Sequence, residues 1–167
     1  GTLPSDIVRA LNSQVDTVRQ IENITGGAGD DTLTGNSDAN IMMGGSGDDT
    51  LFASAGADTL DGGTGGAISG DVADYSILIS QDANVESISV TLQGGSDATV
   101  AISGVAYTHT LSGVEHVTGT TGDDTIVGDI SNNTLLGGDG GDTLSGGAGD
   151  DYIDGGSGSD TVSYIGI

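Results

Sequence analysis

A repeat of nine residues runs through most of this chain and constrains its fold more than any other feature. Each copy has a glycine-rich turn, an acidic residue or its amide at the sixth position, and an apolar residue at the eighth. Clear copies lie at residues 26–34, 44–52 and 146–154. Because six residues of each copy turn and three extend, two copies make one coil of 18 residues. Its apolar side chains point inward, and successive coils stack about 4.8 Å apart.

The repeats form two blocks of five copies, at residues 26–74 and 119–163. Asp31 and Asp124 are 93 positions apart, and most of the pattern recurs at that distance. The sixth positions hold Asp31, Asn40, Asp49, Asp58 and Asp71, then Asp124, Asn133, Asp142, Asp151 and Asp160. The eighth positions hold Leu33, Met42, Leu51, Leu60 and Ala73, then Ile126, Leu135, Leu144, Ile153 and Val162. This phasing predicts the interior of a regular solenoid.

Between the blocks, residues 75–118 alternate apolar and polar side chains with a period of two. The alternating apolar residues include Ile88, Val90, Leu92, Val100 and Ile102. A glycine turn at residues 94–97 separates the two runs. Such a pattern predicts antiparallel strands that form a spacer between the blocks.

The ends of the chain fall outside the repeats. We expect residues 1–25 to end an equivalent spacer or to form a cap, with a short helix after Ser5. We expect residues 164–167 to begin a further, truncated segment.

The charge balance is strongly acidic: 25 Asp and Glu stand against two basic residues, and the net charge is −23. This charge repels nucleic acid and anionic lipid, so neither is an expected partner. No apolar run is long enough for membrane insertion. Cysteine is absent, which excludes disulfides and thiolate metal sites. With so few inward apolar residues, the predicted solenoid needs another source of stability.

The turns offer that source because they gather oxygen atoms. Glycine lets backbone carbonyls converge on one point, and a sixth-position carboxylate faces the turn one coil further on. Carbonyl and carboxylate oxygens with flexible geometry suit calcium better than magnesium, which demands a tight octahedron and retains its waters. Stacked carboxylates repel one another without such ions. We therefore expect folding and the binding of several calcium ions to be one event.

The tandem motif resembles the repeats-in-toxin (RTX) family, and the resemblance covers about 90 of the 167 residues. Repeats of this family form calcium-loaded parallel β-rolls in proteins that leave bacteria by type I secretion. The resemblance implies an all-β fold of two short calcium-stabilised parallel β-rolls, joined by an antiparallel strand-rich spacer. It also implies an extracellular or cell-surface location.

In the family, the carbonyls of one turn and its sixth-position side chain pair with the turn two repeats later. Carried over, this pairs Asp31 with Asp49, Asp49 with Asp71, Asp124 with Asp142, Asp142 with Asp160, and on the opposite edge Asn40 with Asp58 and Asn133 with Asp151. The remaining implied ligands are the turn residues Gly26, Ala28, Gly44, Ser46, Gly62, Gly119, Thr121, Gly137, Asp139, Gly146, Ala148, Gly155 and Ser157. Departures from the pattern are the neutral Asn40 and Asn133, Ala53-Ser54 in place of a glycine pair, and residues 66–69, which interrupt a turn.

Several other polar residues have simpler expected roles. The fifth-position acids Asp30, Asp48, Asp123 and Asp150 are expected to solvate the turns. His109 and His116 are expected to be strand or surface residues, and Tyr75 and Tyr164 to be plugs where a roll meets a spacer. An EF-hand beginning at Asp150 fails because Thr161 stands where a bidentate glutamate is required. Aspartate in nearly every turn excludes a phosphate cradle.

Together these features predict a non-catalytic, calcium-binding structural module of a large secreted bacterial RTX protein of the adhesin type. The alternative is an accessory calcium-binding domain of an extracellular enzyme such as a polysaccharide epimerase, lipase or protease. The chain is not expected to be an enzyme itself, since its sequence offers no credible nucleophile–base pair. The expected partners are calcium ions and other domains of the same polypeptide.

Overall fold

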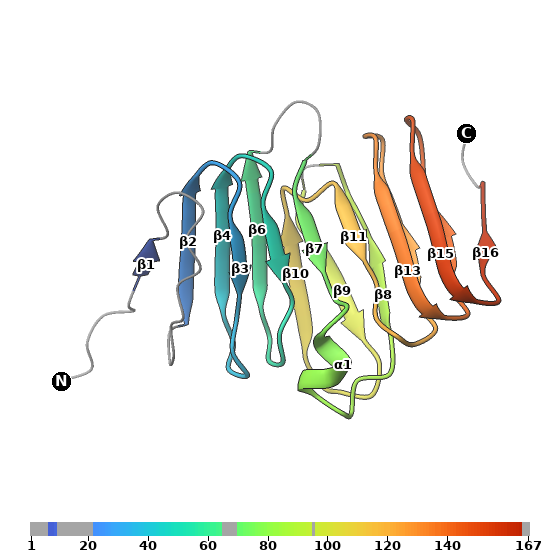
Figure 1. The fold of residues 1–167 in the computed structure, drawn as a ribbon, viewed down its shortest axis with the longest axis horizontal. Helices are drawn as coiled ribbons and strands as arrows, with labels where there is room; N and C mark the ends of the chain where they lie inside the picture. The colour runs from blue at the N-terminus through green and yellow to red at the C-terminus, as the bar shows by residue number, and fades with distance from the viewer. Residues whose placement is uncertain (1–6, 10–21, 65–69, 95, 165–167) are drawn as a thin grey trace.

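The computed structural model describes residues 7–9, 22–64, 70–94 and 96–164. Two sheets lie face to face, and the chain passes from one to the other at nearly every turn (Figure 1). The first sheet contains, in spatial order, β1 (Ile7–Arg9), β2 (Asn23–Ala28), β4 (Ile41–Ser46), β6 (Thr59–Thr64), β10 (Thr108–Ser112), β9 (Ala98–Ile102), β8 (Ile88–Thr91), β12 (Thr125–Val127), β14 (Thr143–Ser145) and β16 (Thr161–Val162). The second contains β15 (Tyr152–Gly158), β13 (Thr134–Gly140), β11 (His116–Thr118), β7 (Val72–Asp74), β5 (Thr50–Phe52) and β3 (Thr32–Thr34).

Within each block the predicted coil of 18 residues is confirmed by the strand register. Ile24 pairs with Met42 and Met42 with Leu60, in parallel ladders of the first sheet. In the second block, Leu135 pairs with Ile153 in the same way. The strands are parallel because every coil runs in the same direction, so each residue stacks on its equivalent one coil later.

Eighth-position side chains form most of the core of the two blocks, and apolar residues of the spacer such as Val90 and Val100 continue it. Leu51, Leu60, Ile126 and Leu135 are each fully buried, and the exposed fractions of the first eight eighth-position residues stay at or below 4%. At the last coil the pattern changes, and Val162 in the edge strand β16 is 43% exposed. Apart from the last coil, each nonapeptide therefore contributes one buried apolar eighth-position side chain to the interior.

The predicted antiparallel spacer is present, and its strands are built into the solenoid. β8 and β9 are antiparallel, as are β9 and β10. The outer members of this group pair with the blocks, β10 with β6 and β8 with β12, both in parallel. In the second sheet, β11 lies between β7 and β13 and pairs with both. The two blocks are thereby joined through both sheets (Figure 1).

This arrangement places equivalent turns of the two blocks on opposite edges of the solenoid. Asp31 lies in the turn before β3, a strand of the second sheet. Asp124, its equivalent in the second block, lies in the turn before β12, a strand of the first sheet. The two blocks therefore repeat in sequence, but a shift along the solenoid axis alone does not bring Asp31 onto Asp124, because the two lie on opposite edges.

Three local features differ from expectation. Residues 7–9, within the region where a helix was expected, form strand β1 beside β2, and the other residues of that expected helix lie outside the described residues. A one-turn helix, α1 (Leu78–Gln81), follows the first block and was not predicted. Tyr75 is fully buried as a plug should be, whereas Tyr164, the last described residue, is 77% exposed. None of the described helical residues forms a segment able to cross a membrane.

Candidate metal centre

The structure brings together the members of all six residue pairs that the family resemblance implied. In each pair the backbone N–H of the earlier residue donates to Oδ1 of the later one, over 2.8 to 3.0 Å. The pairs are Asp31/Asp49, Asp49/Asp71, Asp124/Asp142, Asp142/Asp160, Asn40/Asp58 and Asn133/Asp151. One carboxylate oxygen of each later aspartate is therefore used to hold two coils in register.

The other carboxylate oxygen has no such partner in four of these residues. Oδ2 of Asp31, Asp49, Asp71 and Asp142 is buried and accepts no hydrogen bond in the described part of the chain. A buried charged oxygen without a partner costs several kcal/mol, so such atoms call for a cation. Four buried oxygens in equivalent positions point to a repeated metal site.

Each of these oxygens lies beside the first glycine of its own turn. We call the position that a Cβ atom on that glycine would occupy the cradle of that glycine. A Cβ on Gly26 would lie 2.6 Å from Asp31 Oδ2 and 2.5 Å from Gly44 O, which belongs to the next coil. The cradle of Gly44 receives Asp49 Oδ2 and Gly62 O in the same way, and that of Gly137 receives Asp142 Oδ2 and Gly155 O. Glycine is required here because any side chain would fill the space where oxygens of two coils converge.

These donor sets fit calcium. No group of three or more histidine or acidic side chains capable of holding a metal occurs among the described residues. A cation in a cradle would therefore be held by carboxylates together with backbone carbonyls, which are hard oxygen donors in a flexible arrangement. Carbonyls at the third position take part in the coil-to-coil ladder as well: Ser46 O accepts a hydrogen bond from Gly29 N at 2.6 Å.

The second residue of each turn decides whether the carboxylate stays open. Where that residue is not glycine, its N–H donates to the sixth-position side chain of the same turn and closes it. Such bonds run from Asn36 to Asn40 (2.7 Å), Ser54 to Asp58 (3.3 Å), Thr120 to Asp124 (2.6 Å) and Asp129 to Asn133 (2.8 Å). Where the second residue is glycine it takes a positive φ, as at Gly27 (134°), Gly45 (118°) and Gly138 (113°). Those turns leave Oδ2 open.

This division separates the predicted ligands into two groups. The open turns with a buried Oδ2 end at Asp31, Asp49, Asp71 and Asp142, and the closed turns end at Asn40, Asp58, Asp124 and Asn133. The sequence analysis missed the distinction, although its signal was present in the second position of each turn. Calcium coordination by each individual residue stays a prediction.

Burial raises the pKa of four sixth-position aspartates, Asp49, Asp71, Asp124 and Asp142. The pKa of Asp71 rises from 3.8 to about 6, first because the carboxyl is buried and then because Asp49 and Glu115 are close. The pKa of Asp124 also rises to about 6, again mainly through burial. For Asp49 and Asp142 burial raises the pKa too. Without a cation these carboxyls therefore take up a proton at a higher pH than an exposed aspartate does.

At the end of the first block a histidine stands beside a closed turn. His109 Nε2 donates to Gly56 O at 2.8 Å and lies 3.7 Å from Asp58 Oδ2. Ser54 Oγ donates to that same Asp58 oxygen at 2.7 Å. Burial raises the pKa of Asp58 and lowers the pKa of His109. Asp58 is thus satisfied by side chains, and His109 is a buried strand residue rather than a surface one.

The fifth-position acids do more than solvate the turns. Asp30 Oδ1 accepts a hydrogen bond from Asp48 N at 3.0 Å, and Asp123 Oδ1 accepts one from Gly141 N at 2.8 Å. Gly70 N similarly donates to Asp48 Oδ1 at 3.3 Å. These bonds form a second ladder between coils, next to the one made by the sixth-position residues.

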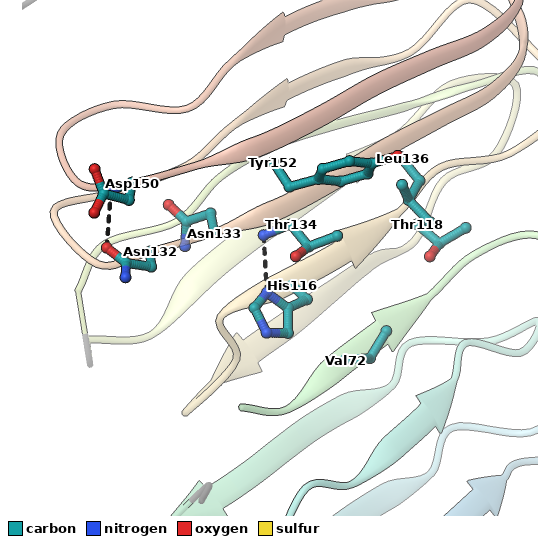
Figure 2. A pocket seen from close by; sticks show the side chains of 9 residues that line it. All are labelled: Val72, His116, Thr118, Asn132, Asn133, Thr134, Leu136, Asp150 and Tyr152. Carbon is teal, nitrogen blue, oxygen red and sulfur yellow. Dashed lines mark hydrogen bonds between the residues drawn. The ribbon is translucent and has the colours of Figure 1, made fainter. Parts of the chain in front are cut away.

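A shallow groove of about 510 Å³ lies on the outer face of the second sheet, and Figure 2 shows the side chains that line it. His116, Thr134 and Tyr152 stand in register across β11, β13 and β15. His116 Nδ1 accepts a hydrogen bond from Thr134 N at 2.8 Å, so this nitrogen is occupied. The groove contains none of the four open carboxylate oxygens and is separate from the cradles.

Comparison with known proteins agrees with this geometry. A family model described as the RTX calcium-binding nonapeptide repeat matches four times, over residues 20–51, 34–66, 109–144 and 127–162. No curated protein sequence matches the chain. Among solved structures, the crystal structure of extracellular lipase LipA from Serratia marcescens is similar over 95% of this chain, with 16% identity and a TM-score of 0.44. The chain corresponds to 31% of the length of that lipase.

Proposed function

This chain belongs to the family of RTX calcium-binding nonapeptide repeats, and from that premise we propose that it is a non-catalytic, calcium-dependent structural module of a secreted bacterial protein of the adhesin type. The observation that carries the proposal is the row of buried carboxylate oxygens without partners, each beside a glycine cradle. The accessory-domain alternative predicted from the sequence shares this module and differs in what the rest of the polypeptide does.

The residues that would hold the ions are the sixth-position aspartates of the open turns and the first glycines of the following coils. Bound calcium would supply positive charge between carboxylates that otherwise face one another across adjacent coils. The protein's own contribution is to position the oxygens: the N–H to Oδ1 bonds fix each carboxylate, and the positive-φ glycines keep its second oxygen free.

Such a module would fold only where calcium is abundant. Extracellular calcium modules bind with dissociation constants of roughly 10⁻⁴–10⁻³ M, whereas sensors and buffers inside cells bind far more tightly. Ions that bind only the folded state stabilise it by mass action. The chain would therefore stay unfolded in a calcium-poor cytosol and during export, and would fold outside the cell.

Circular dichroism of the purified chain tests the proposal. We expect an unfolded spectrum in EDTA and a β-rich spectrum after addition of millimolar calcium, with a cooperative transition between them. Magnesium at the same concentration serves as the control and should not restore the β-rich spectrum. A chain that is fully folded in EDTA, or one that stays unfolded in calcium, contradicts the proposal.

A further inference from the structure

One turn of the spacer (residues 75–118, called the insert below) lies where the next nonapeptide turn of the first block would be expected. Ser112 of β10 pairs with Asp61 of β6, and His116 of β11 pairs with Val72 of β7. Residues 113–115 therefore cross the edge of the solenoid at which β6 ends and β7 begins in the neighbouring coil. They do so without a Gly-Gly-x-Gly-x-Asp motif, because the three residues are Gly, Val and Glu.

Glu115 occupies the place of a sixth-position aspartate in this short turn. Its Oε2 accepts a hydrogen bond from Asp71 N at 2.9 Å. Asp71 makes the same bond with Asp49 N, and Asp49 makes it with Asp31 N, both at 2.8 Å.

Gly113 completes the set of oxygens. A Cβ on Gly62 would collide with Gly113 O and would lie 2.7 Å from Asp71 Oδ2. This repeats the cradle of Gly44, which receives Asp49 Oδ2 and Gly62 O. Asp71 is fully buried, and its Oδ2 accepts no hydrogen bond in the described part of the chain.

We propose that Asp71, Gly113 and Glu115 bind a calcium ion at the junction between the first block and the insert. The inference rests on the proposed function, since it assumes that the cradles hold calcium, and it extends the row of sites beyond the last nonapeptide. The Gly62 cradle holds the same two oxygens as the repeat cradles: an aspartate Oδ2 that is buried and accepts no hydrogen bond in the described residues, and a carbonyl of the next coil. The Glu115 carboxylate lies beside them through its bond with Asp71 N. An ion here ties β10 and β11 to β6 and β7, so the insert shares the calcium-dependent stability of the block.

The variant Glu115→Gln tests this site, because glutamine keeps an oxygen that can accept the Asp71 N–H and removes the charge. The control is Glu86→Gln, which makes the same change at an exposed glutamate of the same insert. Bound calcium per chain is measured by equilibrium dialysis and atomic emission in millimolar calcium. We expect the control to hold as many ions as the unmodified chain and Glu115→Gln to hold one fewer.

An unchanged ion count in folded Glu115→Gln overturns the junction site and leaves the proposed function intact. A native chain that binds no calcium at all overturns both. A second measurement needs no variant: an anomalous difference map from crystals of the native chain grown in calcium. A peak between Asp71 Oδ2 and Gly113 O supports the site, and peaks at the other cradles with none at this position overturn it.

Discussion

At the residue scale, the second position of the turn controls the chemistry of the sixth. A residue with a side chain keeps a negative φ and aims its N–H at the carboxyl of its own turn, as Thr120 does toward Asp124. Glycine reaches positive φ without strain, so Gly138 leaves Asp142 Oδ2 open. Whether the sixth-position oxygen stays open is therefore decided by the backbone as much as by the aspartate.

Replacing Asp142 by asparagine is expected to change stability in opposite directions with and without calcium. Asparagine keeps the oxygen that accepts Asp124 N but removes the buried charge. In EDTA the variant should be the more stable chain, since no unpaired charge is buried. In calcium the midpoint of folding should shift to concentrations about tenfold higher, which corresponds to about 1.4 kcal/mol.

Circular dichroism in EDTA compares the residual folded fractions of Asp142→Asn and the native chain, and calcium titrations measure the shift of the folding midpoint. Asp97→Asn removes the same charge from an exposed turn of the insert and is the control. A variant that folds at the calcium concentration of the native chain would contradict a metal-binding role for Asp142.

At the scale of elements, close stacking of coils depends on glycines whose neighbours are backbone atoms. A Cβ on Gly45, where φ is 118°, would collide with Gly27 O of the preceding coil. Gly29 also has a positive φ, 100°, but a Cβ there would meet nothing within 4 Å. A side chain at either position would therefore force a strained positive φ, but only at Gly45 would its Cβ also collide with another coil.

Alanine variants at these two glycines should separate the energetic cost of backbone strain from the cost of a steric collision between coils. We expect Gly29→Ala to lower the free energy of unfolding by about 1–2 kcal/mol, the cost of a left-handed backbone conformation. Gly45→Ala should lower it by about 2–5 kcal/mol, because overpacking between coils adds to that strain. Urea unfolding in saturating calcium measures both, and equal losses for the two variants would show that coil spacing is not limited at Gly45.

At the scale of the whole molecule, the net charge of −23 opposes folding, and protons would compete with the proposed calcium ions for the same carboxylates. Asp71 and Asp124 have pKa values raised from 3.8 to about 6. An acid with a raised pKa in the folded state retains its proton there when the unfolded chain has released it. Its contribution to stability is therefore complete below pH 3.8 and is lost as the pH rises through 6.

The ion-free chain should consequently gain structure on acidification. In calcium-free buffer we expect the folded fraction to rise as the pH falls from 7 towards 4.5, since protonation removes the repulsion between coils. In limiting calcium, the same change should weaken calcium binding, because protons occupy the ligands. Circular dichroism across this pH range measures the first effect, and a folded fraction that only decreases with acidification would contradict it.

The sequence alone determined what happens within each block. The coil length, the inward position of residues such as Leu51 and Leu135, and the pairing of Asp31 with Asp49 all follow from a fixed separation of 18 residues. These contacts are set by local turn chemistry, which repeats with the motif. The alternation of the insert likewise predicted its antiparallel strands.

Only the tertiary structure decided how the insert joins the blocks. The edge on which each turn lies depends on how many strands the insert adds to each sheet. No local sequence pattern gives that number. The contacts of Glu115 with Asp71 and of His109 with Asp58 follow from that packing. These contacts form because a sheet pairs strands that lie side by side, whatever their separation in the sequence. Residues without a repeat motif can therefore complete a repeat site.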